Sequence, residues 1–171
     1  MKQIIKSLAI AVVMLAFAGT VQAQTATATS NAAAVIIAPL SITNTAGLHF
    51  GTIMRGTSLG TVSVAADGTR TNTGGATLSG LAPLHSAATF NIEGQSGNTV
   101  VITLPVSTTI TNGAESMTVD NFVSTPAAGP TNPLTLPAAA TVLRVGARLN
   151  VAAGQVSGTY TGTFDVSVNY N

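Results

Sequence analysis

The sequence predicts an all-β protein with the architecture of an immunoglobulin-like antiparallel β-sandwich. Three observations support this fold class. Short segments of alternating apolar and polar residues follow one another along the chain, and turn-forming residues separate them. No segment shows the sustained apolar period that is typical of an amphipathic helix. Thr, Val, Ala, Gly and Ser dominate the composition, whereas Lys and Glu, which are common on exposed helix faces, are rare.

Residues 1–23 have the pattern of a secretory signal peptide. Lys2 and Lys6 give a positive start, residues 8–19 form a short apolar run, and Val21 and Ala23 supply small residues before a cleavage site. The apolar run is shorter than the roughly 20 residues that a membrane-spanning helix needs. We therefore expect an exported chain that begins at Gln24 and does not insert into a membrane.

Removal of residues 1–23 leaves four arginines and five acidic side chains, and the chain has no cysteine. So few charges offer no basic surface for nucleic acid or anionic lipid, and we expect neither as a partner. Without disulfides, an exported domain of this size relies on side-chain packing and backbone pairing for its stability.

An Ala/Thr-rich extension, residues 24–34, is predicted to precede one β-sandwich domain, residues 35–171. The predicted strands are residues 34–43, 48–54, 60–65, 76–81, 88–93, 99–104, 116–123, 141–151 and 160–170. Asn112 and Gly113 both tolerate positive φ, so a tight hairpin is predicted at this pair. Residues 126–137 contain four prolines and are predicted to form a surface loop or an edge crossing.

One segment matches a catalytic motif. Residues 56–60 match G-x-S-x-G, and Asp67 and His85 follow Ser58 in the order of a hydrolase triad. That motif requires a turn from a strand into a helix, whereas the residues after Gly60 have a strand pattern. The two histidines and the scattered acidic residues have no metal-ligand spacing. We therefore predict no enzyme activity, no cofactor and no metal site.

The last predicted strand, residues 160–170, has the most regular alternation in the chain. Its apolar face consists of Tyr160, Gly162, Phe164, Val166, Val168 and Tyr170, and the intervening residues are short and polar. Chain termini usually fray, so a regular strand at the extreme C-terminus indicates that a partner pairs with it.

This ending resembles the last strand of chaperone–usher pilins, which have alternating apolar residues, a penultimate Tyr and a Gly fourteen positions from the end. Tyr170 and Gly158 occupy those positions here. The segment "GTYTGTFDVSVNY" is also similar to the closing strand of the archaic, spore-coat-U-like branch of that group. Separately, "IIAPLSI", "LHFGTI" and this ending are similar to a secreted bacterial family known only as a domain of unknown function.

The resemblance to pilins implies a sandwich that lacks one strand and exposes a groove, with Gly158, Tyr160, Phe164, Val166, Val168 and Tyr170 along one wall. It implies that a periplasmic chaperone first fills the groove. The N-terminal extension of the next subunit then replaces the chaperone, and with an outer-membrane usher this gives a head-to-tail fibre at the cell surface. The donor residues would be Ala32, Ala34 and Ile36.

Three alternatives stay open from the sequence. Residues 35–37 are either the apolar part of the donor or the first strand of their own domain. The last strand either lines a groove or packs the core of a complete sandwich. A complete sandwich would favour a monomeric secreted module that binds a glycan or a matrix component, although the exported chain has no Trp and both of its Tyr lie on the apolar face of the last strand.

Overall fold

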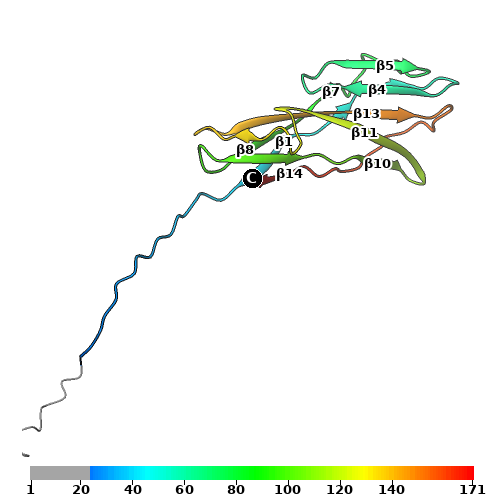
Figure 1. Ribbon diagram of the computed structural model, residues 1–171. Coiled ribbons are helices and arrows are strands. Elements are labelled where there is room, and N and C mark those ends of the chain that lie inside the picture. The colour runs from blue at the N-terminus through cyan, green and yellow to red at the C-terminus, as the bar shows by residue number, and fades with distance from the viewer. Residues whose placement is uncertain (1–23) are drawn as a thin grey trace, which may run out of the picture. The chain divides into compact units, whose positions relative to one another are not determined.

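The computed structural model describes residues 24–171, so the predicted signal peptide lies outside the described residues. The compact unit from Ile36 to Asn171 consists of strands and their connections, and every strand pair in it is antiparallel (Figure 1). Residues 24–171 contain no helix, and hence none that could cross a membrane. The predicted all-β, antiparallel, sandwich-like fold class is confirmed.

The larger sheet has seven strands and forms one layer. Five of them follow the order β1-β8-β13-β11-β10, and β4 and β5 join the sheet at β13. The strands are β1 (Ser41–Ala46), β4 (Gly60–Val64), β5 (Arg70–Gly74), β8 (Ala88–Glu93), β10 (Ser107–Asn112), β11 (Glu115–Thr125) and β13 (Thr141–Val151). Figure 1 shows β11 and β13 running side by side along the domain.

The second layer consists of three smaller pieces. One is a three-stranded sheet with the order β12-β9-β14, and the others are the two-stranded ribbons β2–β7 and β3–β6. The strands are β2 (His49–Phe50), β3 (Ile53–Met54), β6 (Thr77–Leu78), β7 (His85–Ser86), β9 (Thr99–Thr103), β12 (Leu134–Thr135) and β14 (Ser167–Tyr170).

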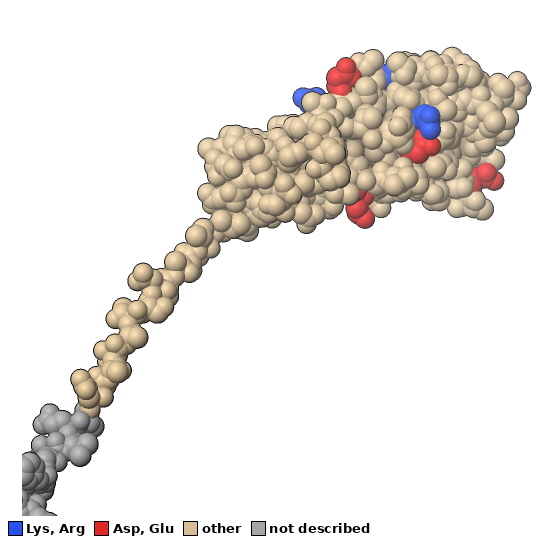
Figure 2. Space-filling view, in the orientation of Figure 1, with Lys and Arg blue, Asp and Glu red and all other residues tan. Residues whose placement is uncertain are grey.

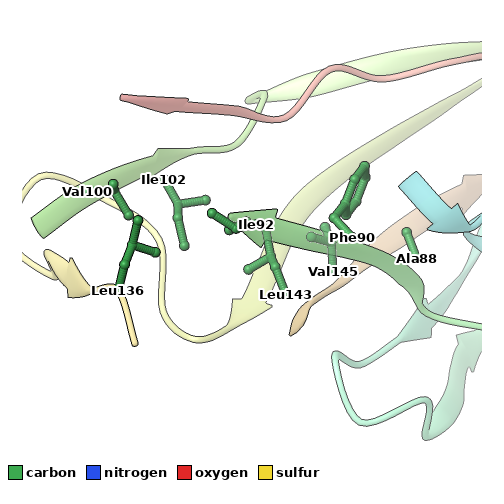
Figure 3. Close-up of a cluster of buried hydrophobic side chains, with 8 residues drawn as sticks. All are labelled: Ala88, Phe90, Ile92, Val100, Ile102, Leu136, Leu143 and Val145. Carbon is green, nitrogen blue, oxygen red and sulfur yellow. The ribbon is translucent and has the colours of Figure 1, made fainter. Parts of the chain in front are cut away.

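Two clusters of buried side chains hold the layers together. The first contains Ala88, Phe90, Ile92, Val100, Ile102, Leu136, Leu143 and Val145 (Figure 3). It joins β8 and β13 of the larger sheet to the three-stranded sheet. The second contains Val62, Ala76, Met117, Val119, Ala147, Leu149 and Val151, with the two ribbons packed against it. Alternate residues of β4, β8 and β13 are buried, as expected for strands with one face on a core.

Strand β13 changes its partner halfway along one edge. Residues 141–145 pair with β8 and residues 147–151 pair with β4, while β11 pairs with the opposite edge. Gly146 lies at this change of partner. A Cβ atom at Gly146 would collide with the carbonyl oxygen of Val64 and lie 2.6 Å from the carbonyl carbon of Ala65. The chain that leaves β4 therefore passes directly over a residue that has no side chain.

Five predicted strands agree with β4, β8, β9, β11 and β13 to within two residues at each end. A tight hairpin forms where it was predicted, but its turn is one residue later than the predicted pair, because Asn112 ends β10 and pairs with Glu115, and Gly113, with a φ of 60°, and Ala114 form the turn. The predicted strand over residues 48–54 is divided into β2 and β3, because Gly51 between them has a φ of 74°. The segment 76–81 forms only the short strand β6.

Four strands were not predicted. β5 and β10 consist mostly of Ser, Thr and Asn, so they lack an apolar alternation, and β7 has only two residues. β12 lies inside the proline-rich segment 126–137, which was predicted as a loop or an edge crossing. The prediction of a strand over residues 34–43 is wrong in position, because β1 begins at Ser41 and residues 34–40 form no strand.

We expect Gly146→Ala to lower the free energy of unfolding by about 1–3 kcal/mol, because the added methyl group overpacks a site closed by backbone. Gly80→Ala is the matched control, since no atom lies within 4 Å of a Cβ at that position. Denaturant unfolding of both variants checks this prediction. Equal stability of the two variants would contradict the assigned role of Gly146.

Candidate assembly edge at the C-terminus

The C-terminal segment lies along the edges of both layers. Strand β14 pairs with β9 in the second layer, whereas Thr161 exchanges backbone hydrogen bonds of 2.9 and 3.0 Å with Thr111 of β10 in the larger sheet. The prediction of one strand over residues 160–170 is therefore wrong in extent. The physical reason is that the partner strands β9 and β10 belong to different layers, so a segment that follows both cannot form a single ladder.

The predicted alternation along this segment is confirmed except at Gly162, which is exposed. The half-buried side chains are those of Tyr160, Phe164, Val166, Val168 and Tyr170, and they pack against the two core clusters. The ring centroid of Phe164 lies 6.3 Å from that of Phe90 in an edge-to-face arrangement and 5.0 Å from that of Phe122. All five side chains face inward, yet none is as fully buried as the residues of the core clusters.

Gly158 and Tyr160 fix the start of the segment. Gly158 has a φ of 152°, and a Cβ atom there would collide with the side-chain amide of Asn112 at the end of β10. The Tyr160 hydroxyl donates a hydrogen bond to the carbonyl oxygen of Val156 (2.8 Å) and accepts one from Nε2 of Gln155 (2.9 Å). Both residues therefore set the path by which the chain reaches β10.

Tyr170 joins the two ends of the domain. Its hydroxyl donates a hydrogen bond to the carbonyl oxygen of Ala38 (2.9 Å) and accepts one from the backbone N–H of Gln95 (2.7 Å). The Gln95 side chain in turn accepts a hydrogen bond from the backbone N–H of Ala38 (3.1 Å). Gly94 leaves room for this arrangement, since a Cβ there would lie 2.6 Å from the Tyr170 hydroxyl.

Strand β14 has one unpaired edge. It pairs with β9 alone, and the backbone N–H of Asn171 donates to the carbonyl oxygen of Thr99 (3.0 Å). In an antiparallel ladder the residues alternate in direction, so Ser167, Asn169 and Asn171 direct their backbone groups toward β9. The backbone groups of Val166, Val168 and Tyr170 point the other way, and in the described residues they have no hydrogen-bond partner. Strand β1 lies near β14 and shares no ladder with it.

Residues 24–39 form no strand and are exposed. Within this segment Val35 is 90% exposed and Ile36 is 94% exposed, although both side chains are large and apolar. The alternative that residues 35–37 belong to the first strand of their own domain is therefore wrong, since that strand is β1. The predicted donor residues Ala32, Ala34 and Ile36 all lie in this exposed segment.

The residues of the G-x-S-x-G motif lead into a strand, because β4 begins at Gly60. Asp67 lies in a turn, where its carboxylate accepts a hydrogen bond from the backbone N–H of Thr69, and His85 lies in β7 opposite Phe50. Ser58 has no side-chain hydrogen bond to either of them among residues 24–171. In the same part of the chain no group of three or more His, Asp or Glu could hold a metal ion. The absence of enzyme activity stays a prediction.

One polar cluster on the larger sheet was not predicted. Arg148 donates from Nε to Asp120 Oδ1 (2.8 Å) and from Nη2 to Asp120 Oδ2 (3.1 Å), and Asn150 Nδ2 donates to Oδ2 (3.0 Å). These hydrogen bonds, chiefly those from Arg148, lower the pKa of Asp120 from its ordinary value of 3.8. The contact depends on the register of β11 against β13, which no local pattern in the sequence specifies.

Residues 40–170 match a protein family described as "Domain of unknown function (DUF4402)". Because the match covers well over half of the chain, the chain belongs to this family. The matched region contains all the strands of both layers and leaves out the exposed extension before Leu40. No match was found among curated proteins, and none was found among solved structures.

We expect Phe164→Ala to lower the free energy of unfolding by about 3 kcal/mol, the low end for loss of a core Phe, because the ring is only half-buried. Thr163→Ala is the control on the opposite face and should change stability by less than about 0.5 kcal/mol. Chemical denaturation of the two variants gives both values. A small effect at Phe164 would mean that the C-terminal segment contributes little to the core.

The stability of the protein should depend on the protonation of Asp120. Its pKa is lowered in the folded state, so its contribution is complete well above pH 3.8 and is lost as the pH falls through the folded-state value. We therefore expect the difference in denaturation midpoint between the natural chain and Asp120→Asn to shrink on acidification. Measurements at neutral pH and at acidic pH check this, and a constant difference would contradict it.

Proposed function

We propose that this chain is the structural subunit of an exported bacterial surface fibre. In the fibre, residues 24–37 of one copy add a strand to the free edge of β14 in the next copy. The proposal rests on the observation that one chain contains both surfaces that such a contact needs. One surface is an unpaired strand edge above half-buried apolar side chains, and the other is an exposed apolar segment without a strand partner.

The two surfaces are compatible in length. An extended segment over residues 24–37 spans about 46 Å, whereas the free edge from Val166 to Tyr170 spans about 17 Å, so the extension is long enough to cover this edge. Main-chain hydrogen bonds to Val166, Val168 and Tyr170 would supply affinity without demanding a particular sequence. Ile36 would fill the largest contact, because the residues before it are mostly Ala and Thr and bury little apolar area.

The contacts of Ala38 favour pairing between copies over pairing within one copy. Ala38 is held at the Tyr170 end of β14. An extension that folded back from this point along its own β14 would run parallel to that strand. An extension that entered from the opposite end would come from a second copy and would run antiparallel, which is the somewhat more stable pairing.

An unpaired edge on an exported protein is an aggregation hazard before assembly. The proposal therefore includes the partners that the resemblance to pilins implies, which are a periplasmic chaperone that covers the edge and an outer-membrane usher. It also includes the export that residues 1–23 predict, with passage through the periplasm to the cell surface.

A synthetic peptide of residues 24–37 should bind to a chain of residues 38–171. Binding should slow hydrogen exchange at the backbone amides of Val166, Val168 and Tyr170, because these face the free edge. The amides of Ser167 and Asn169 already face β9 and serve as internal controls. Nuclear magnetic resonance with amide exchange measures both sets in one sample.

A peptide with Ile36→Asp should bind at least tenfold more weakly, because a charge would enter an apolar contact. The matched control is Val35→Asp, which lies on the opposite face of an extended donor and should bind nearly as well as the natural peptide. The proposal fails if the natural peptide protects none of the three edge amides, or if the complete chain from Gln24 stays monomeric at high concentration with that edge exposed.

A further inference from the structure

A shallow hollow of about 460 Å³ lies on the larger sheet, away from the edge of β14. Its lining includes Thr61, Thr73, Thr118 and Asn150, which we call the floor, together with the buried Gln155 and the exposed Leu59, which we call the rim. Thr61, Thr118 and Asn150 alternate along their strands with buried residues of the second core cluster, so they belong to the outer face of the sheet. Thr73 lies on the same face because it pairs with Thr61.

The floor is a row of polar side chains that crosses four neighbouring strands. Thr61 of β4 pairs with Thr73 of β5 and with Asn150 of β13, and Asn150 contacts Thr118 of β11. Neighbouring strands are about 4.8 Å apart, so the row presents hydroxyl and carboxamide groups at that spacing. The hydroxyls of Thr61 and Thr73 are 2.7 Å apart, and one hydroxyl hydrogen of this pair stays free for an outside acceptor.

Two carboxamides of the hollow are fixed so that only their oxygens stay free. Asn150 Nδ2 donates to the carbonyl oxygen of Thr118 (3.3 Å) and to Asp120 Oδ2 (3.0 Å). Gln155 is only 9% exposed, and its Nε2 donates to the carbonyl oxygen of Ser116 (3.3 Å) and to the Tyr160 hydroxyl (2.9 Å). The carbonyl and carboxylate oxygens that bind Asn150 Nδ2 can only accept hydrogen bonds. The amide nitrogen, and not the amide oxygen, must therefore face them.

No charged side chain of residues 24–171 lines the hollow. Asp120, which accepts a hydrogen bond from Asn150, is held in a two-pronged ion pair with Arg148, and Arg55 donates to the carbonyl oxygen of Gly154 beside Gln155. At the rim, Leu59 is 74% exposed and offers apolar surface beside the polar floor. The hollow thus combines two fixed acceptors, a row of hydroxyls and an apolar rim without a net charge.

We propose that this hollow binds a neutral carbohydrate unit. The hydroxyl groups of a sugar are the donors that the oxygens of Asn150 and Gln155 lack, and they also accept from the threonine hydroxyls. The C–H face of the sugar packs against Leu59. A peptide strand fits less well, because the row runs across the strands, whereas the free backbone edge of β5 runs along one end of the row. This inference does not depend on the proposed function, since the hollow and the β14 edge share no residue.

The test is a titration of the chain of residues 24–171 with D-glucose, D-galactose, D-mannose and N-acetylglucosamine, followed by nuclear magnetic resonance. At least one sugar should shift the signals of Thr61, Thr118 and the side-chain amides of Asn150 and Gln155 in a saturable manner. Thr61→Val and Thr118→Val each remove a hydroxyl at constant shape and should weaken binding about three- to tenfold. Thr125→Val, on the same sheet face outside the hollow, should bind as the natural chain does.

Two further probes separate this proposal from its alternatives. D-glucuronate tests the demand for a neutral ligand, and a glycine-rich peptide tests whether amide donors suffice. The proposal is overturned if no sugar shifts these signals up to about 100 mM, which covers even very weak binding. It is also overturned if glucuronate or the peptide binds more tightly than every neutral sugar, or if the threonine variants bind unchanged while circular dichroism shows that they are folded.

Discussion

The arrangement of the whole domain depends on the ladders of β13. This strand pairs with β8 and β4 in succession along one edge and with β11 along the other, so it fixes the positions of three neighbours at once. Both core clusters contain residues of β13, which are Leu143 and Val145 in the first and Ala147, Leu149 and Val151 in the second. The partner change at Gly146 is therefore also the place where one core gives way to the other.

The second layer is less continuous than the larger sheet, because its strands before β8 have only two residues each. Gly51 separates β2 from β3 along the chain, and the guanidinium of Arg70 compensates by donating to the carbonyl oxygens of Phe50 (2.9 Å) and Ser79 (2.7 Å). Side-chain hydrogen bonds to backbone thus replace ladder bonds that the ribbons do not make. In Figure 2 charged side chains are few and scattered over the visible face.

The sequence allowed the strands with a regular apolar alternation to be predicted, such as β8 and β13, because one face of each contacts a core. It did not reveal β5 and β10, whose Thr and Ser side chains give no such pattern. The inward-facing residues of the C-terminal segment, from Tyr160 to Tyr170, followed directly from their period of two. The period of two did not reveal that these side chains are only half-buried. It also did not reveal the contact of Asp120 with Arg148. Burial and cross-strand contacts depend on which strands become neighbours, and local pattern does not determine that choice.

The hydrogen bonds of Tyr170 also determine where a mechanical load would enter the domain. A pull on the chain before Ala38 meets first the two hydrogen bonds of that residue, to the Tyr170 hydroxyl and to the Gln95 side chain. The next contacts to bear the load are the β9–β14 ladder in the second layer and the β1–β8 ladder in the larger sheet. Tension applied at one residue is thus divided between the two layers, and both ends of the polypeptide share it.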